Sequence, residues 1–388
     1  RKRGEEKTAN SNKKRLKPMN FSHTEERQML ADMAQRFVRE QYPIERRHEI
    51  AASDDGYSKE MWAQMAELGL VGALFPENAG GFGGAGFDIA VVFEELGRGL
   101  VVEPFLPTLL AGNILDEAHS ELIENVIGGT SLLALAHGEP ASRYTLSHVE
   151  TTAEKSGDDW VLNGNKAVVM NGDSADHFVV SARTAGDKTD ADGISRFLIP
   201  AGAITQRGYS TVDGYRAAEI SLDNVTVGAD ALIGKQGDGL AAIERAHAVG
   251  TLAVCAEALG AIEVAIDATL DYLKTRTQFG VPIGKFQALQ HRMADMMTER
   301  EQIRSAVINA AGHMESEDRD WYVSALKNLI GRSGRMIAEE CIQMHGGIAM
   351  TWEYNVGGPM GFEIGTISKA RMWVACRLIC GAQPSSCA

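Results

Sequence analysis

Residues 274–296 read KTRTQFGVPIGKFQALQHRMADM and carry side chains that could do chemistry where an unbroken helix would otherwise run. Arg276 offers a planar fork of N–H donors that matches carboxylate and phosphate oxygens. Gln278, Phe279 and Gly280 follow it, and a proline and a second Phe-Gln pair come soon after. The sequence therefore predicts a corner between two helices, with Arg276 at its start. A cation there would also suit the C-terminal dipole of the preceding helix.

A second candidate is the glycine-rich stretch PENAGGFGGAGFD at 76–88. Such a stretch could cradle a phosphate if it joined a strand to a helix and ended in Gly-Lys-Ser/Thr. No predicted strand precedes it and no such ending follows. The pattern therefore favours a plain loop between two helices.

Composition and charge limit the classes of function. The 388 residues suffice for two or three domains with a sizeable core, and 44% of them are hydrophobic. A formal net charge of -14 argues against a nucleic-acid partner, which would need clustered Lys and Arg. Charged residues interrupt every long apolar segment, so the sequence predicts no membrane span.

The five cysteines show neither a metal-ligand spacing nor a disulfide framework. Cys255 and Cys341 fall inside apolar helical patterns, and Cys376, Cys380 and Cys387 lie near the end of the chain. We therefore expect no metal site. A reducing cytoplasm is the predicted location.

Hydrophobic periodicity divides the chain into an α+β arrangement of three domains. We expect a disordered basic leader at 1–18, an N-terminal helical domain at 19–132 whose first helix begins at a Ser22-x-x-Glu25 capping box, and a middle antiparallel β domain at 133–234. A C-terminal four-helix-bundle domain follows at 235–357, and residues 358–388 form a divergent tail.

This domain order and four separated motifs resemble the acyl-CoA dehydrogenase family. The motifs are PENAGGFGG with EELGRG at 94–99, GDDWVLNGNKAVVMNG, RTQFGVPIGKFQALQHRMADM, and QMHGGIAMTWEYNVG at 343–357. The resemblance covers roughly residues 20–357. It implies FAD as the cofactor, an acyl-CoA thioester as the substrate, an electron-transferring flavoprotein as the oxidant, and a dimer of dimers.

The resemblance also implies a role for the corner. Matching residues in the family reach across a subunit interface to the pyrophosphate and adenosine of a neighbour's FAD, with a Gly-Gly turn beside them that admits close backbone approach. In this sequence they are Arg276, Gln278, Phe279, Gln343, Gly346 and Gly347.

The catalytic base of the family has no clear counterpart, so the catalytic residue stays unknown. A Glu removes the α-proton of the thioester while the β-hydrogen leaves as hydride to the flavin. In one branch this Glu lies 26 residues before the Arg of RTQFG, which is Gly250 here, followed by Thr251. Glu244 and Arg245, about two turns away, are expected to be an exposed helix pair.

The other branch of the family places its Glu about 24 residues after the Gly-Gly turn. That position is Ala370, in a tail that no longer matches. Glu363 in GFEIGT imitates the family's Glu-Gly-Thr, but seven positions early and with Ile364 inserted. A spliced or frameshifted terminus accounts for this tail better than a displaced base.

Contacts on the flavin side are altered as well. Val168, Val169 and Met170 replace the family's Trp-Ile-Thr or Trp-Ile-Ser, which removes a hydroxyl donor to the flavin. GEPASRY at 138–144 replaces an acidic-Gly-Ser substrate loop. Everything that acts on a neighbour's FAD is thus kept, and everything that builds a centre in this chain is changed.

This pattern resembles the small, base-lacking subunit of heteromeric enzymes such as pimeloyl-CoA and steroid side-chain dehydrogenases. A second acyl-CoA dehydrogenase subunit is then the expected partner. Two alternatives stay open: a self-sufficient homomeric dehydrogenase with an unrecognised base, and a flavin-free scaffold or regulatory subunit. Acyl specificity depends on the shape of the pocket, which the sequence does not reveal.

Overall fold

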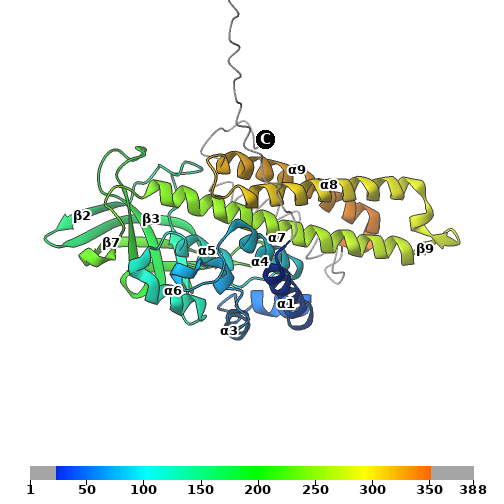
Figure 1. Ribbon diagram of the computed structural model, residues 1–388, viewed down its shortest axis with the longest axis horizontal. Coiled ribbons are helices and arrows are strands. Elements are labelled where there is room, and N and C mark those ends of the chain that lie inside the picture. The colour runs from blue at the N-terminus through cyan, green and yellow to red at the C-terminus, as the bar shows by residue number, and fades with distance from the viewer. Residues whose placement is uncertain (1–22, 351–388) are drawn as a thin grey trace, which may run out of the picture.

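The computed structural model describes residues 23–350, and Figure 1 shows an elongated molecule. A β-sheet domain occupies one end, three long helices run away from it, and the N-terminal helices pack against them. The predicted α+β fold class is confirmed. The predicted leader at 1–18, the tail at 358–388 and the cap residue Ser22 lie outside the described residues.

Six helices and several short 3-10 turns form the N-terminal part. The helices are α1 (Glu25–Gln41), α2 (Ile44–Ala51), α3 (Lys59–Glu67), α4 (Gly86–Gly99), α5 (Phe105–Gly112) and α6 (Ser120–Ile127). The predicted cap is wrong: helix α1 is capped by Thr24 rather than by Ser22, and the Thr24 hydroxyl accepts a hydrogen bond from the Arg27 amide at 3.3 Å. The predicted glycine-rich loop lies before α4, where helical and 3-10 segments flank it.

The β domain is one eight-stranded sheet with the order β6-β7-β3-β2-β4-β5-β8 and β1 beside β4. Its strands are β1 (Leu133–Ala136), β2 (Thr152–Ser156), β3 (Asp159–Met170), β4 (His177–Arg183), β5 (Ile194–Pro200), β6 (Thr205–Ser210), β7 (Arg216–Val227) and β8 (Leu232–Ile233). The sheet is mixed rather than purely antiparallel as predicted, because β1 runs parallel to β4. Strand β2 also pairs in parallel with β4, at Thr152 and Arg183.

The C-terminal part consists of α7 (Leu240–Thr275), a hairpin of β9 (Thr277–Gln278) and β10 (Val281–Pro282), α8 (Gln287–Gly312) and α9 (Arg319–His345), with a 3-10 turn at Gly346–Met350. Within the described residues, these are three of the helices expected for a four-helix bundle. Helix α7 is long and apolar enough to cross a membrane, but 94% of its most apolar window is buried inside the protein. It is the central core helix of the molecule.

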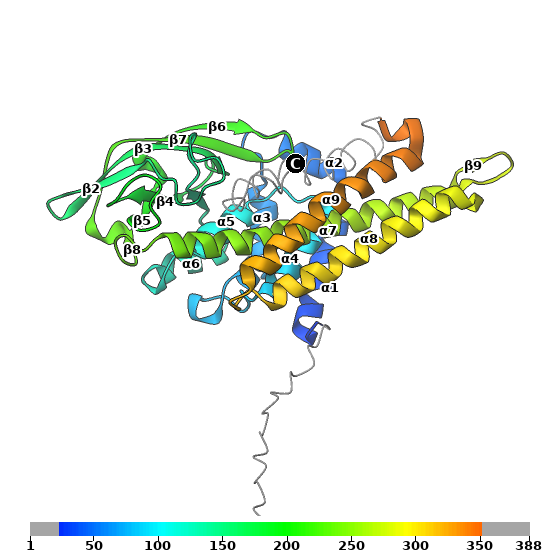
Figure 2. The same cartoon turned by 90° about the horizontal axis from the view of Figure 1, so that it is seen from above.

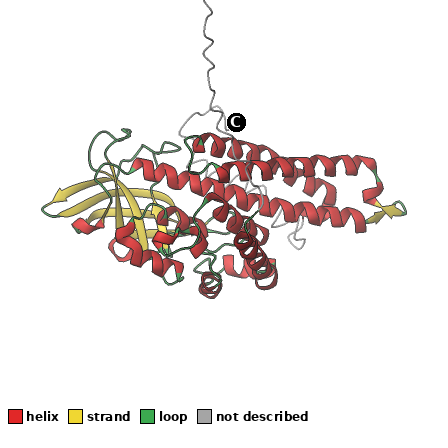
Figure 3. Ribbon diagram, viewed as in Figure 1, coloured by secondary structure: helices red, strands yellow, loops and turns green. Residues whose placement is uncertain are grey.

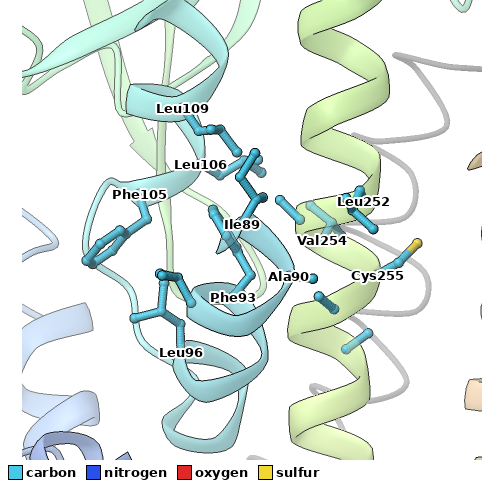
Figure 4. Packing of buried hydrophobic residues seen from close by; sticks show 14 of the residues in the cluster. Ile89, Ala90, Phe93, Leu96, Phe105, Leu106, Leu109, Leu252, Val254 and Cys255 are labelled. Carbon is cyan, nitrogen blue, oxygen red and sulfur yellow. The ribbon is translucent and has the colours of Figure 1, made fainter. Parts of the chain in front are cut away.

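Helices α4 and α7 cross at two reciprocal glycines. A Cβ added to Gly97 would lie 1.9 Å from the Glu257 carbonyl oxygen, and one added to Gly260 would lie 1.9 Å from the Glu94 carbonyl oxygen. The two backbones therefore touch, and apolar side chains such as Phe93 fill the space beside the crossing (Figure 4). This close approach explains Gly97, the first glycine of the EELGRG motif.

Candidate functional site

The predicted corner is a two-residue β-hairpin at the tip of the helical bundle. Gln278 pairs with Val281, and the turn residues Phe279 and Gly280 have φ values of 54° and 78°. Two positive φ angles match the twist of a tight hairpin, but for Phe279 this conformation is strained. Phe279 is also 90% exposed. A large apolar side chain held in this way at a tip is suited to contact a partner molecule.

An aromatic stack brings the two halves of the predicted cofactor clamp to one end of the bundle. Tyr272 in the last turns of α7 stacks on His345 at the end of α9, with ring centroids 4.5 Å apart. The Tyr272 carbonyl also accepts a hydrogen bond from the Arg276 amide at 2.8 Å. Since Gly346 follows His345, the hairpin and the Gly346–Gly347 turn lie at the same end, as Figure 2 shows.

The clamp residues point to solvent, as a bound cofactor would require. Arg276 and Gln343 are exposed, and no hydrogen bond or ion pair joins the Arg276 side chain to another residue within 23–350. A Cβ on Gly346 or Gly347 would meet no atom of residues 23–350 within 4 Å, so these residues leave the backbone open to a diphosphate. Gln278 differs, because its amide donates to the Thr277 carbonyl at 2.8 Å.

Gly250, at the position of one family base, is closed off by helix α5. A Cβ there would lie 2.5 Å from Leu110 Cδ2 and 3.6 Å from Leu106 Cδ1. Thr251 is buried and donates its hydroxyl to the His247 carbonyl at 2.8 Å, which occupies it within its own helix. This part of α7 therefore offers no carboxylate. The other candidate positions, Glu363 and Ala370, lie outside the described residues.

The expected helix pair between Glu244 and Arg245 is wrong. Arg245 binds Glu315 in the connection between α8 and α9 through two bonds of 2.6 and 2.9 Å. Glu244 instead lies near Asp320 and Arg319, and burial followed by the Asp320 charge raises its pKa. Residues one apart on a helix point in different directions, so each finds a partner on another element.

A small cavity of about 50 Å³ lies between α5, the end of β1 and β3. Val168 and Met170 line it, and Val168 has a φ of 55° at an irregularity in β3. Met170 has no polar hydrogen to donate, as expected from the sequence. Val168 and Met170 therefore offer a flavin no hydroxyl donor, whereas the exposed Arg276 suits a diphosphate.

A buried ion pair fixes one wall of this cavity. Lys166 Nζ lies 2.7 Å from Glu139 Oε1 and 3.1 Å from Ser181 Oγ. Burial lowers the pKa of Lys166 to about 8 although Glu139 opposes this shift. Burial raises the pKa of Glu139, but Lys166 and the hydrogen bonds from Thr151 and the Glu150 amide hold it below its ordinary value. The carboxylate thereby ties the loop at 139–151 to the sheet.

Two buried histidines lie beside the ion pair. A hydrogen bond of 2.8 Å joins His137 Nδ1 to Ser181 Oγ. The ring centroid of His137 is 5.7 Å from that of His247 on α7. Burial lowers the pKa of both rings, to about 3 for His247. Both are therefore neutral at pH 7, and neither acts readily as a proton acceptor.

Sequence reasoning missed this buried group. Lys166 stands in a segment that the sequence assigns to the β domain, and its burial contradicts the usual exposure of lysine. Glu139 in the altered loop GEPASRY was the available sign, because a carboxylate there can pair with a lysine that points inward. Only the pairing of strands shows that the two residues meet.

Comparison with known proteins identifies the molecule. Residues 24–123 match the acyl-CoA dehydrogenase N-terminal domain, 134–225 the middle domain and 237–360 the C-terminal domain. The chain belongs to the acyl-CoA dehydrogenase family. It is therefore an oxidoreductase of acyl-CoA thioesters by family, and FAD is the cofactor.

Three relatives illustrate the likeness. A probable acyl-CoA dehydrogenase, YngJ of Bacillus subtilis, is 30% identical over 355 residues, covering 87% of this chain and 92% of the relative. Butyryl-CoA dehydrogenase from Megasphaera elsdenii superposes with a TM-score of 0.81 at 28% identity, covering 90% of this chain and 95% of that one. A variant of the Tcur3481-Tcur3483 steroid ACAD gives 0.76 at 28% identity, covering 90% and 97%.

Proposed function

We propose that this acyl-CoA dehydrogenase chain is a base-lacking small subunit that completes the FAD site of a second, catalytic subunit. The observation that carries the proposal is the contrast between the two halves of its own site. Gly250 has no carboxylate and is packed against Leu110, while Arg276 at the other end of α7 is exposed and unpartnered among the described residues.

The clamp would act on the partner's cofactor in a simple way. Arg276 would donate to the FAD diphosphate, with the backbone of Gly346 and Gly347 beside it, and Phe279 would cover the adenosine. Gln278 and Gln343 would supply neutral hydrogen bonds. Bound FAD supplies hydride acceptance, and the catalytic carboxylate would come from the partner chain.

The same proposal includes the wider assembly. A dimer of dimers with a second acyl-CoA dehydrogenase subunit would receive the acyl-CoA, pass electrons to an electron-transferring flavoprotein and work in the cytoplasm. The pairing in the name of the Tcur3481-Tcur3483 steroid ACAD, at 28% identity, supports a two-component assembly. A self-sufficient homomeric enzyme and a flavin-free scaffold are the competing functions.

Expression with and without a partner distinguishes these functions. Proton abstraction by a positioned base contributes about 10²–10⁴ in rate, so the chain alone should be nearly inert. The chain alone should also retain little FAD. Co-expressed with a neighbouring gene product that carries the missing Glu, it should give a yellow complex whose 450 nm band bleaches with an acyl-CoA.

Two outcomes would contradict the proposal. If the purified chain alone is yellow and an acyl-CoA reduces its flavin, the homomeric enzyme is the correct function, and Glu363→Gln then tests that residue as the base. If no acyl-CoA dehydrogenase partner confers flavin binding, the scaffold function is favoured instead.

A further inference from the structure

The proposed clamp has two halves that come from different helices. Arg276 follows the end of α7, and Gly346 and Gly347 follow the end of α9. The stack of Tyr272 on His345 lies between these two ends, with ring centroids 4.5 Å apart and ring planes inclined by 29°. Because each ring belongs to the last turn of its helix, the stack sets how the two helix ends lie relative to each other.

On the side of α7, the backbone transmits the position of Tyr272 to Arg276. The Tyr272 carbonyl accepts a hydrogen bond from the Arg276 amide at 2.8 Å, and the Arg276 carbonyl accepts one from the Ile283 amide at 2.9 Å. Both backbone groups of Arg276 are thus held, one by the helix and one by the segment after the hairpin. A displacement of Tyr272 would therefore move the start of the arginine side chain.

On the side of α9, His345 is fixed before the chain leaves the helix. The residue is 4% exposed, and its Nδ1 donates a hydrogen bond to the Cys341 carbonyl at 2.8 Å. Cys341 Sγ in turn lies 3.7 Å from the Ala265 carbonyl oxygen of α7. Gly346 follows with φ 70° and ψ -146°, a backbone conformation that glycine alone adopts readily. The Gly-Gly turn therefore begins directly after a fixed ring.

We infer that Tyr272 and His345 are positioning residues, which hold the Arg276 guanidinium and the backbone of the Gly-Gly turn at a spacing that one diphosphate bridges. The inference rests on the proposed function, in which the diphosphate belongs to the partner's FAD. A ligand that meets two groups already held in place loses less free energy to ordering than one that must bring them together. The two rings act through the clamp and need not touch the cofactor.

A second histidine–tyrosine stack in the same bundle provides a matched control. His313 stacks on Tyr322 with ring centroids 3.8 Å apart, and its Nδ1 donates a hydrogen bond to the Asn309 carbonyl at 2.7 Å. As at His345, this carbonyl belongs to the residue one helical turn earlier. His313 follows α8 and Tyr322 lies in the first turn of α9, so this stack lies at the opposite end of the bundle from the hairpin (Figure 2). Its loss should affect stability without changing the clamp.

Nucleotide titration of the assembled complex tests the inference. The complex with the partner subunit is stripped of FAD and titrated calorimetrically with ADP, which carries the diphosphate and adenosine of FAD, and with AMP, which carries one phosphate. His345→Ala should weaken ADP binding about 2–10-fold, in line with what an aromatic pair contributes, and AMP binding by less than about 2-fold. His345→Phe keeps a ring against Tyr272 and should restore most of the ADP affinity.

The dependence on Arg276 separates positioning from general stability. In an Arg276→Ala background, His345→Ala should weaken ADP binding by less than about 2-fold, because the guanidinium that the stack positions is gone. His313→Ala should leave ADP affinity unchanged, even where it lowers the Tm as much as His345→Ala does. Tyr272→Leu, which keeps an apolar side chain at this half-buried position, should reproduce the effect of His345→Ala.

Several results would overturn the inference. Unchanged ADP affinity in both His345→Ala and Tyr272→Leu, an equal loss in His313→Ala, or a full loss that persists in the Arg276→Ala background would each show that the stack only stabilises the bundle. A His345→Phe variant that binds ADP no better than His345→Ala would exclude the ring contact as the cause. The proposed function fails separately: if the native complex retains no FAD and binds no ADP, the clamp itself is wrong, whatever the variants do.

Discussion

Single side chains at the tip of the bundle carry the proposed cofactor role, and Arg276 is the one among them with a positive charge. A charge-assisted hydrogen bond contributes about 1.5–3 kcal/mol, so Arg276→Ala should weaken FAD retention by roughly one to two decades. Flavin content and FAD affinity of the assembled complex measure this. Gln343→Ala should act in the same direction but more weakly, because its contact is neutral.

A matched control is available in the same corner. Lys285 is also exposed and also carries one positive charge, so Lys285→Ala removes equal charge without the guanidinium fork. If Arg276→Ala leaves flavin content unchanged, or if Lys285→Ala lowers it equally, a specific diphosphate contact is excluded and general electrostatics or assembly is responsible.

The sequence predicts which residues form the clamp better than it predicts their conformation. Residue type and spacing point to Arg276 and the Gly346–Gly347 turn. The positive φ of Phe279 is not visible there, because an aromatic residue is an unusual choice for that region. Nor is the positive φ of Arg143 visible in the sequence, since it depends on how the loop folds back on Glu139.

At the scale of elements, the crossing of α4 and α7 determines how the N-terminal helices sit on the core. The methyl group in Gly97→Ala would meet the Glu257 carbonyl oxygen at 1.9 Å, which forces the backbones apart. Overpacking of this kind costs about 1–3 kcal/mol or more. We expect the midpoint of thermal unfolding to fall by about 1–4 °C in calorimetry.

Gly128→Ala is the control for this prediction. Gly128 follows α6, and an added Cβ would make ordinary contacts with the carbonyl oxygens of Glu124 at 3.4 Å and Asn125 at 3.7 Å. It should therefore leave the midpoint nearly unchanged. A similar fall in both variants would attribute the effect to changes in the unfolded chain rather than to the helix crossing.

Element types follow from the sequence more readily than element partners. The apolar pattern of α7 predicts a buried helix, and β-branched runs predict the strands. The four residues of β1 are too short for periodicity to assign, and their parallel pairing with β4 depends on contacts 44 residues apart, such as Leu133 with His177. The partner of Arg245 is likewise set by the fold, because Glu315 lies 70 residues away.

At the scale of the whole molecule, the three domains meet around buried carboxyl groups near the end of α4. Glu103 is 2% exposed and accepts a hydrogen bond from the Ser58 amide at 3.4 Å and another from Tyr42. Close by, Tyr215, which directly precedes strand β7, donates to Glu257 of α7 at 3.2 Å. The N-terminal helices, the β domain and the core helix are thus joined by buried polar groups.

Arg47 also faces this joint, and its guanidinium donates to the Asp213 carbonyl at 2.7 Å. Burial, and after it the charge of Glu103, raises the pKa of Tyr42. The positive charge of Arg47 opposes this shift. For Glu103 itself, burial dominates over the hydrogen bonds and raises the pKa from 4.5 to about 7. The folded protein therefore holds a proton on Glu103 at pH values where the unfolded chain has lost it.

This proton gives a stability that depends on pH in a definite direction. Between about pH 4.5 and 7 the folded state binds more protons, so the contribution of Glu103 to the free energy of unfolding falls as pH rises. The full change is on the order of 3 kcal/mol and is complete above the folded pKa.

The Glu103→Gln variant has no carboxyl group to ionise at this position. It should therefore be more stable than the native chain at pH 8 and lack this component of the pH profile. Denaturant titrations at pH 5, 6, 7 and 8 on both proteins measure the difference. Parallel profiles for the two proteins would show that Glu103 ionises normally and that the joint is held by packing alone.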